Sequence, residues 1–382
     1  MKDIISAYKR NLWQITLYLF ANILFIFKYV SRTDISASLV AVLYVVAILG
    51  VIYLYNTLAP KISETALKYS SFALLAVTIL CIVAALVYID PYSVRVDRWS
   101  AVSFFLEGLF NGEYPYGIHT HVSETNFPSP FPLWHVINIP FYLIGDVGTG
   151  LIFFLIITFA IVKIYFNSYR KVFFFLSLLI LSPSYWWEVA VRSDSLSNGF
   201  LVLTFILWYA KKGYSMNKNF LLTILCCGVI ASTRLSAVLP VALFLFAQYL
   251  QINWLKKILF PLSILGFVVL VFMPFILWTV DGTYVFFTRN PFMSQTSVGN
   301  PIFLMIMVVA GMATALKWKN TNQYFGYTAT FMFVFMAGSQ LSLIMTRGIS
   351  GSFFTDSTYD LSYFTLYLPY TLMALADKIT NK

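Results

Sequence analysis

Residues 72–89 read FALLAVTILCIVAALVYI, a run of eighteen side chains that includes no charge. Such a run is long enough to cross the ~30 Å hydrocarbon core of a bilayer, which takes about 20 apolar residues. Residues 258–280 form a second run of the same kind. Of all 382 residues, 60% are hydrophobic and 10% are charged, whereas a soluble domain carries about 25% charged residues. The chain lacks the polar surface that water requires and is predicted to be a multi-pass helical membrane protein.

Twelve apolar runs follow one another along the sequence, and each is predicted to be a membrane-spanning helix. They cover residues 11–30, 36–57, 71–89, 149–167, 171–187, 195–211, 219–232, 235–251, 258–280, 300–316, 323–345 and 361–376. A further run, 131–144, is short and is interrupted by His135, Asn138 and Pro140, so we expect it to dip into the membrane or lie on its surface. The predicted fold class is all-α: a polytopic membrane helical bundle of about twelve spans. It forms a single transmembrane domain over residues 1–382, without a soluble domain.

Lysine and arginine sort the loops onto two sides. Seven short clusters hold sixteen of the 25 basic residues, and by the positive-inside rule these clusters are cytoplasmic. They lie at residues 2–10, 61–68, 170–171, 211–218, 256–257, 317–319 and 378–382, so both termini are predicted to be cytoplasmic. The loops of the opposite side carry arginine but no lysine. Their basic residues are Arg32, Arg95, Arg98, Arg192, Arg234, Arg289 and Arg347.

This topology places the longest loop, residues 90–130, on the outer face of the cell membrane. The loops 281–299 and 346–360 are the next largest outer loops, and every cytoplasmic loop is short. The protein is therefore predicted to act at the outer surface of the membrane. The net charge is +10, but its distribution over cytoplasmic loops argues against a nucleic-acid partner.

The outer loop 90–130 supplies two carboxylates and a helical pattern. Apolar residues recur at helical spacing from Trp99 to Leu109, which predicts a helix lying in the membrane interface with its apolar face down. Asp97 stands just before this helix, so it can serve as the N-cap, as a catalytic group, or as both. Asp90 is the second carboxylate of the loop. Paired carboxylates can perform acid/base chemistry.

The three histidines of the chain, His119, His121 and His135, fall within seventeen residues of one another. A zinc site is one hypothesis for them, but no cysteine or HExxH spacing supports it. A polar role of His119 and His121 around an anionic or sugar substrate is the favoured functional interpretation. Solvated loop histidines are the simpler alternative. No metal and no cofactor are expected.

Two arginines lie at the outer ends of apolar runs, in Arg192-Ser193-Asp194 and Ser232-Thr233-Arg234. An arginine at membrane depth is costly and usually has a partner or a ligand. Guanidinium offers a planar, two-pronged donor that suits phosphate. For Arg192 a salt bridge to Asp194 or Glu188 is a serious alternative. For Arg234 no acid is adjacent in sequence, which favours a ligand.

Several short motifs follow one another in an order that resembles a known family. They are Asp97, Gly112-Glu113-Tyr114-Pro115-Tyr116, Pro130-Phe131-Pro132-Leu133, Arg192-Ser193-Asp194 and STRLSAVLP at 232–240. The order resembles that of GT-C class membrane glycosyltransferases, and looks most like the bacterial polyprenyl-phosphate-sugar-dependent type, which includes the mannosyltransferases. The topology is similar to that of the family over nearly the whole chain.

The resemblance implies an inverting transfer of a sugar from a polyprenyl-phosphate donor to an acceptor hydroxyl on the outer face. It implies that Asp97 is the general base, with Asp90 as second choice, and that Arg234 and, less surely, Arg192 bind the donor phosphate. Substrate contacts are also expected from Asp194, Tyr114 and Tyr116. His119 and His121 have no counterpart in the family, and their expected substrate contacts rest on the residue pattern of the loop. The acceptor would be a glycan or glycolipid of the cell envelope.

Two other functions are compatible with a protein of this class. A transporter or flippase for lipid-linked sugars would show inverted repeats and charges near mid-membrane. A surface polysaccharide polymerase would carry its large outer loop later in the chain. Nucleotide-binding motifs do not occur in the sequence, so an enzyme of this kind needs an activated substrate that arrives through the lipid.

Overall fold

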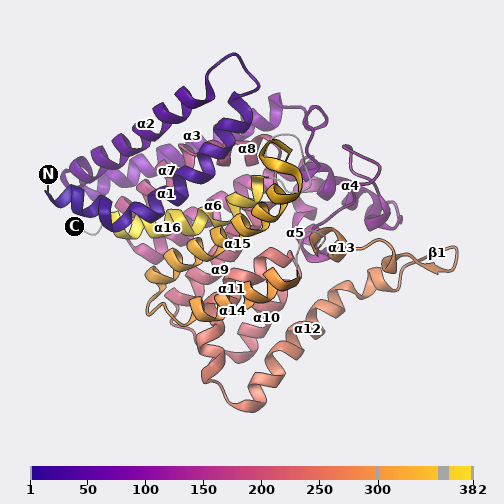
Figure 1. Cartoon of the computed structure of the whole chain (residues 1–382). Helices are drawn as coiled ribbons and strands as arrows, with labels where there is room; N and C mark the ends of the chain where they lie inside the picture. Colours follow the sequence, from indigo (N-terminus) through magenta and orange to yellow (C-terminus); the bar gives the residue numbers. More distant parts are fainter. Residues whose placement is uncertain (1, 297–300, 352–360, 380–382) are drawn as a thin grey trace. The chain divides into compact units, whose positions relative to one another are not determined.

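A computed structural model describes residues 2–296, 301–351 and 361–379, which form sixteen α-helices, short 3₁₀ turns and one two-stranded hairpin (Figure 1). The predicted helical fold is thus confirmed. Of the predicted outer loop 346–360, residues 352–360 lie outside the described residues. The same holds for residues 380–382 of the last basic cluster.

Six helices in the described residues are long and apolar enough to cross a membrane, and the bent pair α7–α8 would make a seventh span. The six segments are Asn11–Val30, Ala37–Lys61, Glu64–Tyr88, Val147–Phe166, Trp254–Ile276 and Thr321–Met345. This agrees with a helical membrane protein, but twelve spans are not confirmed. The apolar helices α10, α14 and α11 have 12, 15 and 17 residues. At 1.5 Å per residue they measure about 18 to 26 Å, short of the ~30 Å core.

The chain divides into two compact units, and each is described by itself. The first comprises Met1–Cys81, Ile156–Glu188 and Met305–Lys382, and the second comprises Ile82–Leu155 and Val189–Leu304. Four helices contain a boundary between the units. They are α3 (Glu64–Tyr88), α6 (Gly150–Phe166), α8 (Pro183–Ala190) and α14 (Pro301–Ala315).

The first unit is built around its last helix. The elements that lie wholly in this unit are α1 (Lys2–Val30), α2 (Ala37–Leu58), η1 (Ala59–Lys61), α7 (Tyr169–Ile180), α15 (Thr321–Ser350), η7 (Leu361–Tyr367) and the last helix, α16 (Leu368–Ile379). Helix α16 packs against α1, α7 and α15, and its residues from Leu368 to Asp377 are buried. Buried Asp377 accepts a hydrogen bond from Lys171 at 2.7 Å, so the charge at the end of α16 is paired.

The predicted span 171–187 is not one straight helix. Helices α7 and α8 meet at an angle of 67° because Pro183 begins α8 and disfavours helical backbone in the residue before it. Side chains of the same unit satisfy the polar groups that the break exposes. Tyr18 donates to the Leu178 carbonyl at 2.6 Å, and Asn22 Oδ1 accepts from the Ser182 hydroxyl at 2.5 Å. The break is therefore built into the fold.

The second unit contains loop 90–130 and the described residues 281–296 of loop 281–299. Its elements are η2 (Pro91–Ser93), α4 (Arg98–Phe110), η3 (Pro115–Gly117), α5 (Pro132–Leu143), η4 (Val147–Thr149), α9 (Asp194–Lys211), α10 (Phe220–Ala231), α11 (Leu235–Gln251), α12 (Trp254–Ile276), β1 (Thr279–Val280), β2 (Thr283–Tyr284), η5 (Val285–Phe287) and α13 (Pro291–Thr296). Helix α10 packs against α11 and α12, and α11 packs against α9. Helix α4 packs against α5, η3 and η4.

Two features of this unit differ from the sequence prediction. Helix α4 forms where expected, but Ser100 and Ser103 on its polar side are buried, so it does not lie on a lipid surface with only an apolar face covered. Their burial is possible because Ser100 finds polar partners inside the unit. Helix α12 continues into the hairpin β1–β2 (Figure 1). Asp281 and Gly282 form its turn with φ of 49° and 76°, the conformation that Asp-Gly favours in a two-residue hairpin.

Candidate functional site

The two carboxylates of loop 90–130 have different environments. Asp90 is exposed and caps η2, because its side chain accepts from the backbone N–H of Tyr92 at 3.0 Å. Asp97 is half-buried and occupies the N-cap position of α4, yet its side chain makes no cap hydrogen bond. The backbone of Asp97 has φ −81° and ψ 2°, whereas a capping residue normally has extended backbone. Asp90 is thus the capping residue, and Asp97 is not.

Asp97 is left with an unused acceptor. Within the described residues, no hydrogen bond or ion pair involves its carboxylate, although its backbone carbonyl accepts from the N–H of Ala101 at 2.8 Å. A half-buried carboxylate without a partner can accept a proton from a bound hydroxyl group. The predicted role as helix cap is wrong, and the predicted role as base stays a prediction.

The three histidines occupy three different environments. His119 is exposed, and its ring lies 4.8 Å from the ring of Phe127. His121 is half-buried, with Nδ1 2.7 Å from Ser100 Oγ and Nε2 2.9 Å from the Val94 carbonyl oxygen. Among the described residues no group of three His, Cys, Asp or Glu side chains is placed to hold a metal ion.

His135 belongs to the core of the unit. Its ring is fully buried and stacks on Phe105 at 3.5 Å between centroids. Burial is the main cause that lowers the pKa of His135 to about 3; the hydrogen bond to the Pro130 carbonyl acts in the opposite direction, and the Arg234 charge adds to the lowering. The imidazole is therefore neutral at physiological pH. His135 is not a solvated loop histidine.

Arg192 forms an ion pair with an acid that the sequence did not suggest. Its Nε donates to Asp146 at 2.7 Å, rather than to Asp194 or Glu188. Its Nη2 donates to the carbonyls of Leu86 and Ile89 at 2.8 and 3.0 Å. Arg192 adopts φ +50°, a rare value for a residue with a side chain, and these three acceptors hold it there. Arg192 thereby fastens the end of α3 to η4.

Arg234 also has an acidic partner. Its Nε and Nη2 donate to Asp194 Oδ2 at 2.7 and 2.5 Å, and both side chains are buried. The lack of a neighbouring acid in sequence was therefore misleading, because Asp194 lies 40 positions earlier in the chain. Two of the predicted substrate-binding residues are thus brought together.

The structure joins the starts of α4, α9 and α11. Arg98 Nη1, at the start of α4, donates to Ser195 Oγ at 3.2 Å, and Ser195 lies at the start of α9. The residue before Ser195 is Asp194, which pairs with Arg234 at the start of α11. The positive ends of helix dipoles favour an anion. The motifs 130–133 and 232–240 meet as well, since the backbone N–H of Phe131 donates to the Thr233 carbonyl at 2.9 Å.

The two tyrosines of the Gly112–Tyr116 motif use their hydroxyls inside the protein. Tyr114 donates to the Arg289 carbonyl at 2.8 Å, and Tyr116 donates to the Pro130 carbonyl at 3.0 Å. Burial raises the pKa of both phenols, which keeps them protonated as donors. The structure therefore gives both a visible role in holding the outer loops together.

Sequence reasoning missed two residues that shape this region. Gln295 on α13 accepts from the N–H of Leu235 at 2.9 Å and donates to the Ser129 carbonyl, so it ties loop 281–299 to the other outer segments. No sequence signal marks it. Asp146 caps η4 and pairs with Arg192. Its position just before a turn that opens a predicted span was a visible capping signal.

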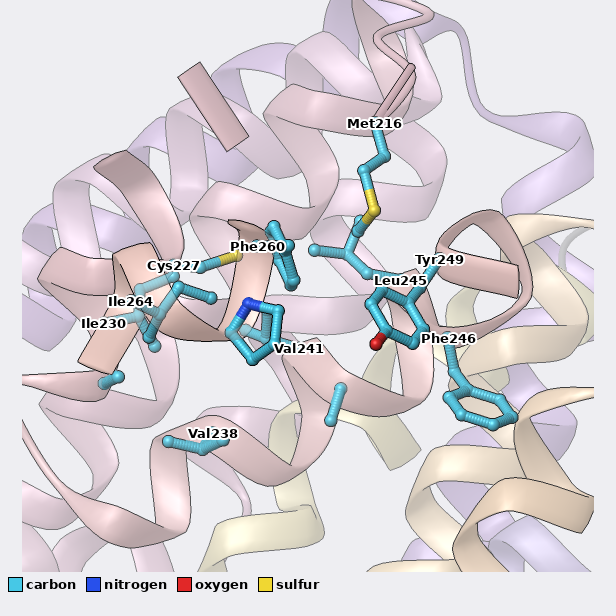
Figure 2. Close-up of a pocket in the computed structure, with 13 residues that line it drawn as sticks. Met216, Cys227, Ile230, Val238, Val241, Leu245, Phe246, Tyr249, Phe260 and Ile264 are labelled. Atoms are coloured by element: carbon cyan, nitrogen blue, oxygen red, sulfur yellow. The ribbon is translucent and has the colours of Figure 1, made fainter. Parts of the chain in front are cut away.

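Helices α10, α11 and α12 enclose an apolar cavity of about 250 Å³ (Figure 2). The labelled side chains that point into it include Val241, Leu245 and Phe260. Val238 lies one helical turn after Arg234, and Tyr249 lines the other end. The rise along α11 from Val238 to Tyr249 is about 16 Å at 1.5 Å per residue. The cavity has the shape and polarity for a hydrocarbon chain.

No known protein family matches the sequence, and no curated protein or solved structure matches it either. The fold defines a helical protein with several membrane-capable spans. Within the described residues, the contacts of Arg98 with Ser195 and of Arg234 with Asp194 form a buried polar cluster at the starts of α4, α9 and α11, and Asp97 is the sequence neighbour of Arg98.

Proposed function

We propose that this protein is a GT-C type glycosyltransferase that moves a sugar, with inversion, from a polyprenyl-phosphate donor to a hydroxyl of a glycan or glycolipid. The observation that carries the proposal is the Asp97 carboxylate, which is half-buried and makes no hydrogen bond or ion pair within the described residues. The family resemblance gives this carboxylate its chemistry.

In the proposed reaction Asp97 accepts the proton of the acceptor hydroxyl. The hydroxyl oxygen forms a bond to the anomeric carbon of the sugar, and the bond from that carbon to the phosphate oxygen breaks. Polyprenyl phosphate leaves with the electron pair. A positioned general base contributes roughly 10²–10⁴-fold to such a rate. Donors aimed at the leaving phosphate add electrostatic stabilisation as its charge develops.

The donor site in this proposal uses the start of α11. Arg234 would donate to the phosphate, and Asp194 would hold the Arg234 guanidinium in place. Arg192, close to Asp194 in the sequence, is the second proposed phosphate contact. The apolar cavity that begins at Val238 would hold the lipid chain, since it runs along α11 away from Arg234. Of the remaining predicted contacts, His119 is exposed and stays a proposed substrate contact.

The proposal includes the topology derived from charge. The helices cross a cell membrane about twelve times in all, short spans included, with both termini in the cytoplasm and loop 90–130 on the outer face. Because lysine is confined to the other side, the outer loops offer arginine for phosphate. The product would enter surface glycan or glycolipid assembly.

A transfer assay tests the proposal. Purified protein in lipid nanodiscs is incubated with radiolabelled sugars on polyprenyl phosphate, including mannose, and with a mixed glycolipid acceptor fraction. We expect label to pass from one donor to the acceptor and to require Asp97. No incorporation from any donor in the panel would contradict the proposed activity.

A lipid-linked sugar transporter is the second candidate, and one observation favours it. Broken membrane spans and buried acids are typical of transporters. Here the break between α7 and α8 is followed by Glu188, which is fully buried and accepts from the Thr365 hydroxyl at 3.0 Å. Movement of intact lipid-linked sugar across vesicles, without transfer to an acceptor, would support this second function.

A further inference from the structure

His121 contacts one residue on each side of Asp97 in the sequence, the backbone of Val94 and the side chain of Ser100. Its Nε2 lies 2.9 Å from the carbonyl oxygen of Val94, three residues before Asp97. Its Nδ1 lies 2.7 Å from Ser100 Oγ, three residues after Asp97, and its backbone N–H donates to the same hydroxyl oxygen at 3.3 Å. One side chain therefore links the two ends of the segment that carries the carboxylate.

The partners of His121 determine which nitrogen carries a proton. A carbonyl oxygen can only accept, so Nε2 must be protonated and donate to Val94. In the neutral ring Nδ1 is then the acceptor. The Ser100 hydroxyl has a single proton and lies 2.7 Å from Nδ1 but 3.2 Å from the Asp97 carbonyl oxygen, so it donates to the nearer Nδ1. The edges of the aromatic rings of Tyr92 and Trp99 pack around the imidazole at 5.8 and 6.3 Å between centroids. The ring is thus held by hydrogen bonds and by packing.

This link explains why Asp97 does not cap its own helix. A capping aspartate needs extended backbone so that its carboxylate reaches the N–H groups of the first turn, here those of Trp99 and Ser100. With Val94 and Ser100 both tied to His121, Asp97 keeps ψ near 2°, and the carboxylate stays off those N–H groups. A carboxylate that caps a helix has used its acceptor, whereas Asp97 retains it.

We infer that His121 is a positioning residue, which keeps the Asp97 carboxylate available by preventing it from capping α4. The catalytic consequence rests on the proposed function, but the conformational one does not. Without the imidazole, segment 94–100 is free to become extended at Asp97, and the carboxylate moves to the N–H groups. The helix then gains a cap while the protein loses its base.

Four variants test this in the full-length protein in nanodiscs. His121→Ala removes both hydrogen bonds of the imidazole and keeps the backbone N–H of residue 121, His121→Asn keeps a polar atom near the Nδ1 position, and His121→Gln keeps one near the Nε2 position. Val122→Ala is the matched control, because Val122 is an exposed neighbour in the same loop. The measurements are kcat, KM for the acceptor, the melting temperature, and the rate at which a carbodiimide with glycine ethyl ester modifies Asp97, read by peptide mass spectrometry.

We expect His121→Ala to lower kcat by about 10- to 100-fold, as misplacing a reacting group does, with KM changed by less than about threefold. Asp97 modification should slow by roughly fivefold as the carboxylate becomes a cap. The melting temperature should stay near that of the unsubstituted protein, and the Asn and Gln variants should fall between. Val122→Ala should match the unsubstituted protein in every measurement.

Unchanged kcat in His121→Ala would overturn the inference, and so would a loss of kcat that tracks the melting temperature through all three His121 variants. If the unsubstituted protein transfers sugar from no donor, the proposed function fails on its own. Carbodiimide labelling then decides the inference: slower modification of Asp97 in His121→Ala supports the positioning role, and equal modification overturns it.

Discussion

The break between α7 and α8 and the start of α4 are both polar interruptions in an apolar chain, but their polar atoms are used differently. At the break, Asn22 Oδ1 accepts from the hydroxyls of Ser182 and Ser184 and from the Ser184 N–H. At the start of α4, the Asp97 carboxylate accepts from none of the described residues. A buried polar group that is fully satisfied stabilises a fold. A carboxylate that accepts no hydrogen bond, on a segment whose conformation is fixed by other contacts, is available to act as a base.

The largest effect is expected when the Asp97 carboxylate is replaced. Asp97→Asn should lower the transfer rate by roughly 10²–10⁴-fold, because the amide cannot take the proton of the acceptor hydroxyl. Initial rates with the active donor measure this. Asp90→Asn is the control and should stay within a small factor, since an amide oxygen can still cap η2. Equal losses in both variants would remove the distinction between the two carboxylates.

The second prediction concerns the buried ion pair between Arg234 and Asp194 in the second unit. Arg234→Ala should destabilise the protein by about 3–5 kcal/mol, because it leaves the buried Asp194 carboxylate unpaired. Thermal unfolding followed by fluorescence measures the loss. The double variant Asp194→Asn/Arg234→Gln should recover most of the stability but still need more donor for half-maximal rate. Recovery of donor use along with stability would show that Arg234 only balances a charge.

The third prediction tests the satisfied side of the comparison. Asn22→Ala should destabilise the first unit by about 1–3 kcal/mol, since the Ser182 and Ser184 hydroxyls and the Ser184 N–H lose their shared acceptor. The melting temperature should fall, while the transfer rate at a temperature well below unfolding should be unchanged. Asn56→Ala is the control, because the Asn56 side chain donates only to the Ile52 carbonyl of its own helix. A transfer rate that falls with an unchanged melting temperature would assign the break a direct role in the reaction.

The fourth prediction uses pH on a buried group of the second unit. The folded pKa of His135 is about 3, below the ordinary value of 6.5, so the unfolded chain binds the proton and the folded chain does not. The contribution of neutral His135 to the free energy of unfolding is fully present above pH 6.5. It falls as the pH drops towards 3, by roughly 1.4 kcal/mol per pH unit at most. Melting temperatures between pH 7 and pH 5 should show the fall. His135→Phe keeps a ring against Phe105 and should flatten the slope in this window. A slope as steep as before would place the responsible group elsewhere.

The smallest effect is expected in the apolar cavity. The Ala242→Trp side chain fills part of the cavity and displaces part of the donor's lipid chain. The lipid then loses burial of about two methylene groups, at ~0.8 kcal/mol each, which should raise the donor KM about tenfold. Leu250→Trp is the control, because Leu250 is exposed and does not line the cavity. A short-chain donor that does not reach Ala242 should be affected by neither change. The same rise in KM for both donors would mean that the lipid chain lies elsewhere.

Much of the fold was predictable, because helices form between near neighbours in sequence. Ten of the twelve apolar runs lie largely within one α-helix of the described residues, as 235–251 does with α11, whereas 171–187 is divided between α7 and α8 and 361–376 between η7 and α16. Whether each run forms one straight helix was less predictable. Residues 171–187 break at Pro183, a signal that was visible in the sequence, whereas the partners that satisfy the break lie about 160 positions away on α1. The hairpin at Asp281-Gly282 also had a local signal.

The candidate site was predictable only as a set of residue types. The sequence pointed to Asp97, Arg192, Asp194 and Arg234, but the pairing of Arg192 with Asp146 and of Arg234 with Asp194 spans 46 and 40 positions. Whether Asp97 caps α4 depends on its backbone conformation. That conformation is coupled to a ring at position 121, beyond the reach of any helical pattern.

Composition and period by themselves determined that this chain forms helices and that several of them are apolar enough to cross a membrane, since both properties depend on local hydrogen bonds and on how little charge the chain carries. Only the tertiary structure decided which polar groups are used to hold the fold, and that the Asp97 carboxylate is not among them. Asn22 is spent, Arg234 is paired, and Asp97 is kept free between Val94 and Ser100. Long-range contacts make that choice because a hydrogen-bond acceptor is satisfied by whatever donor folding brings to it.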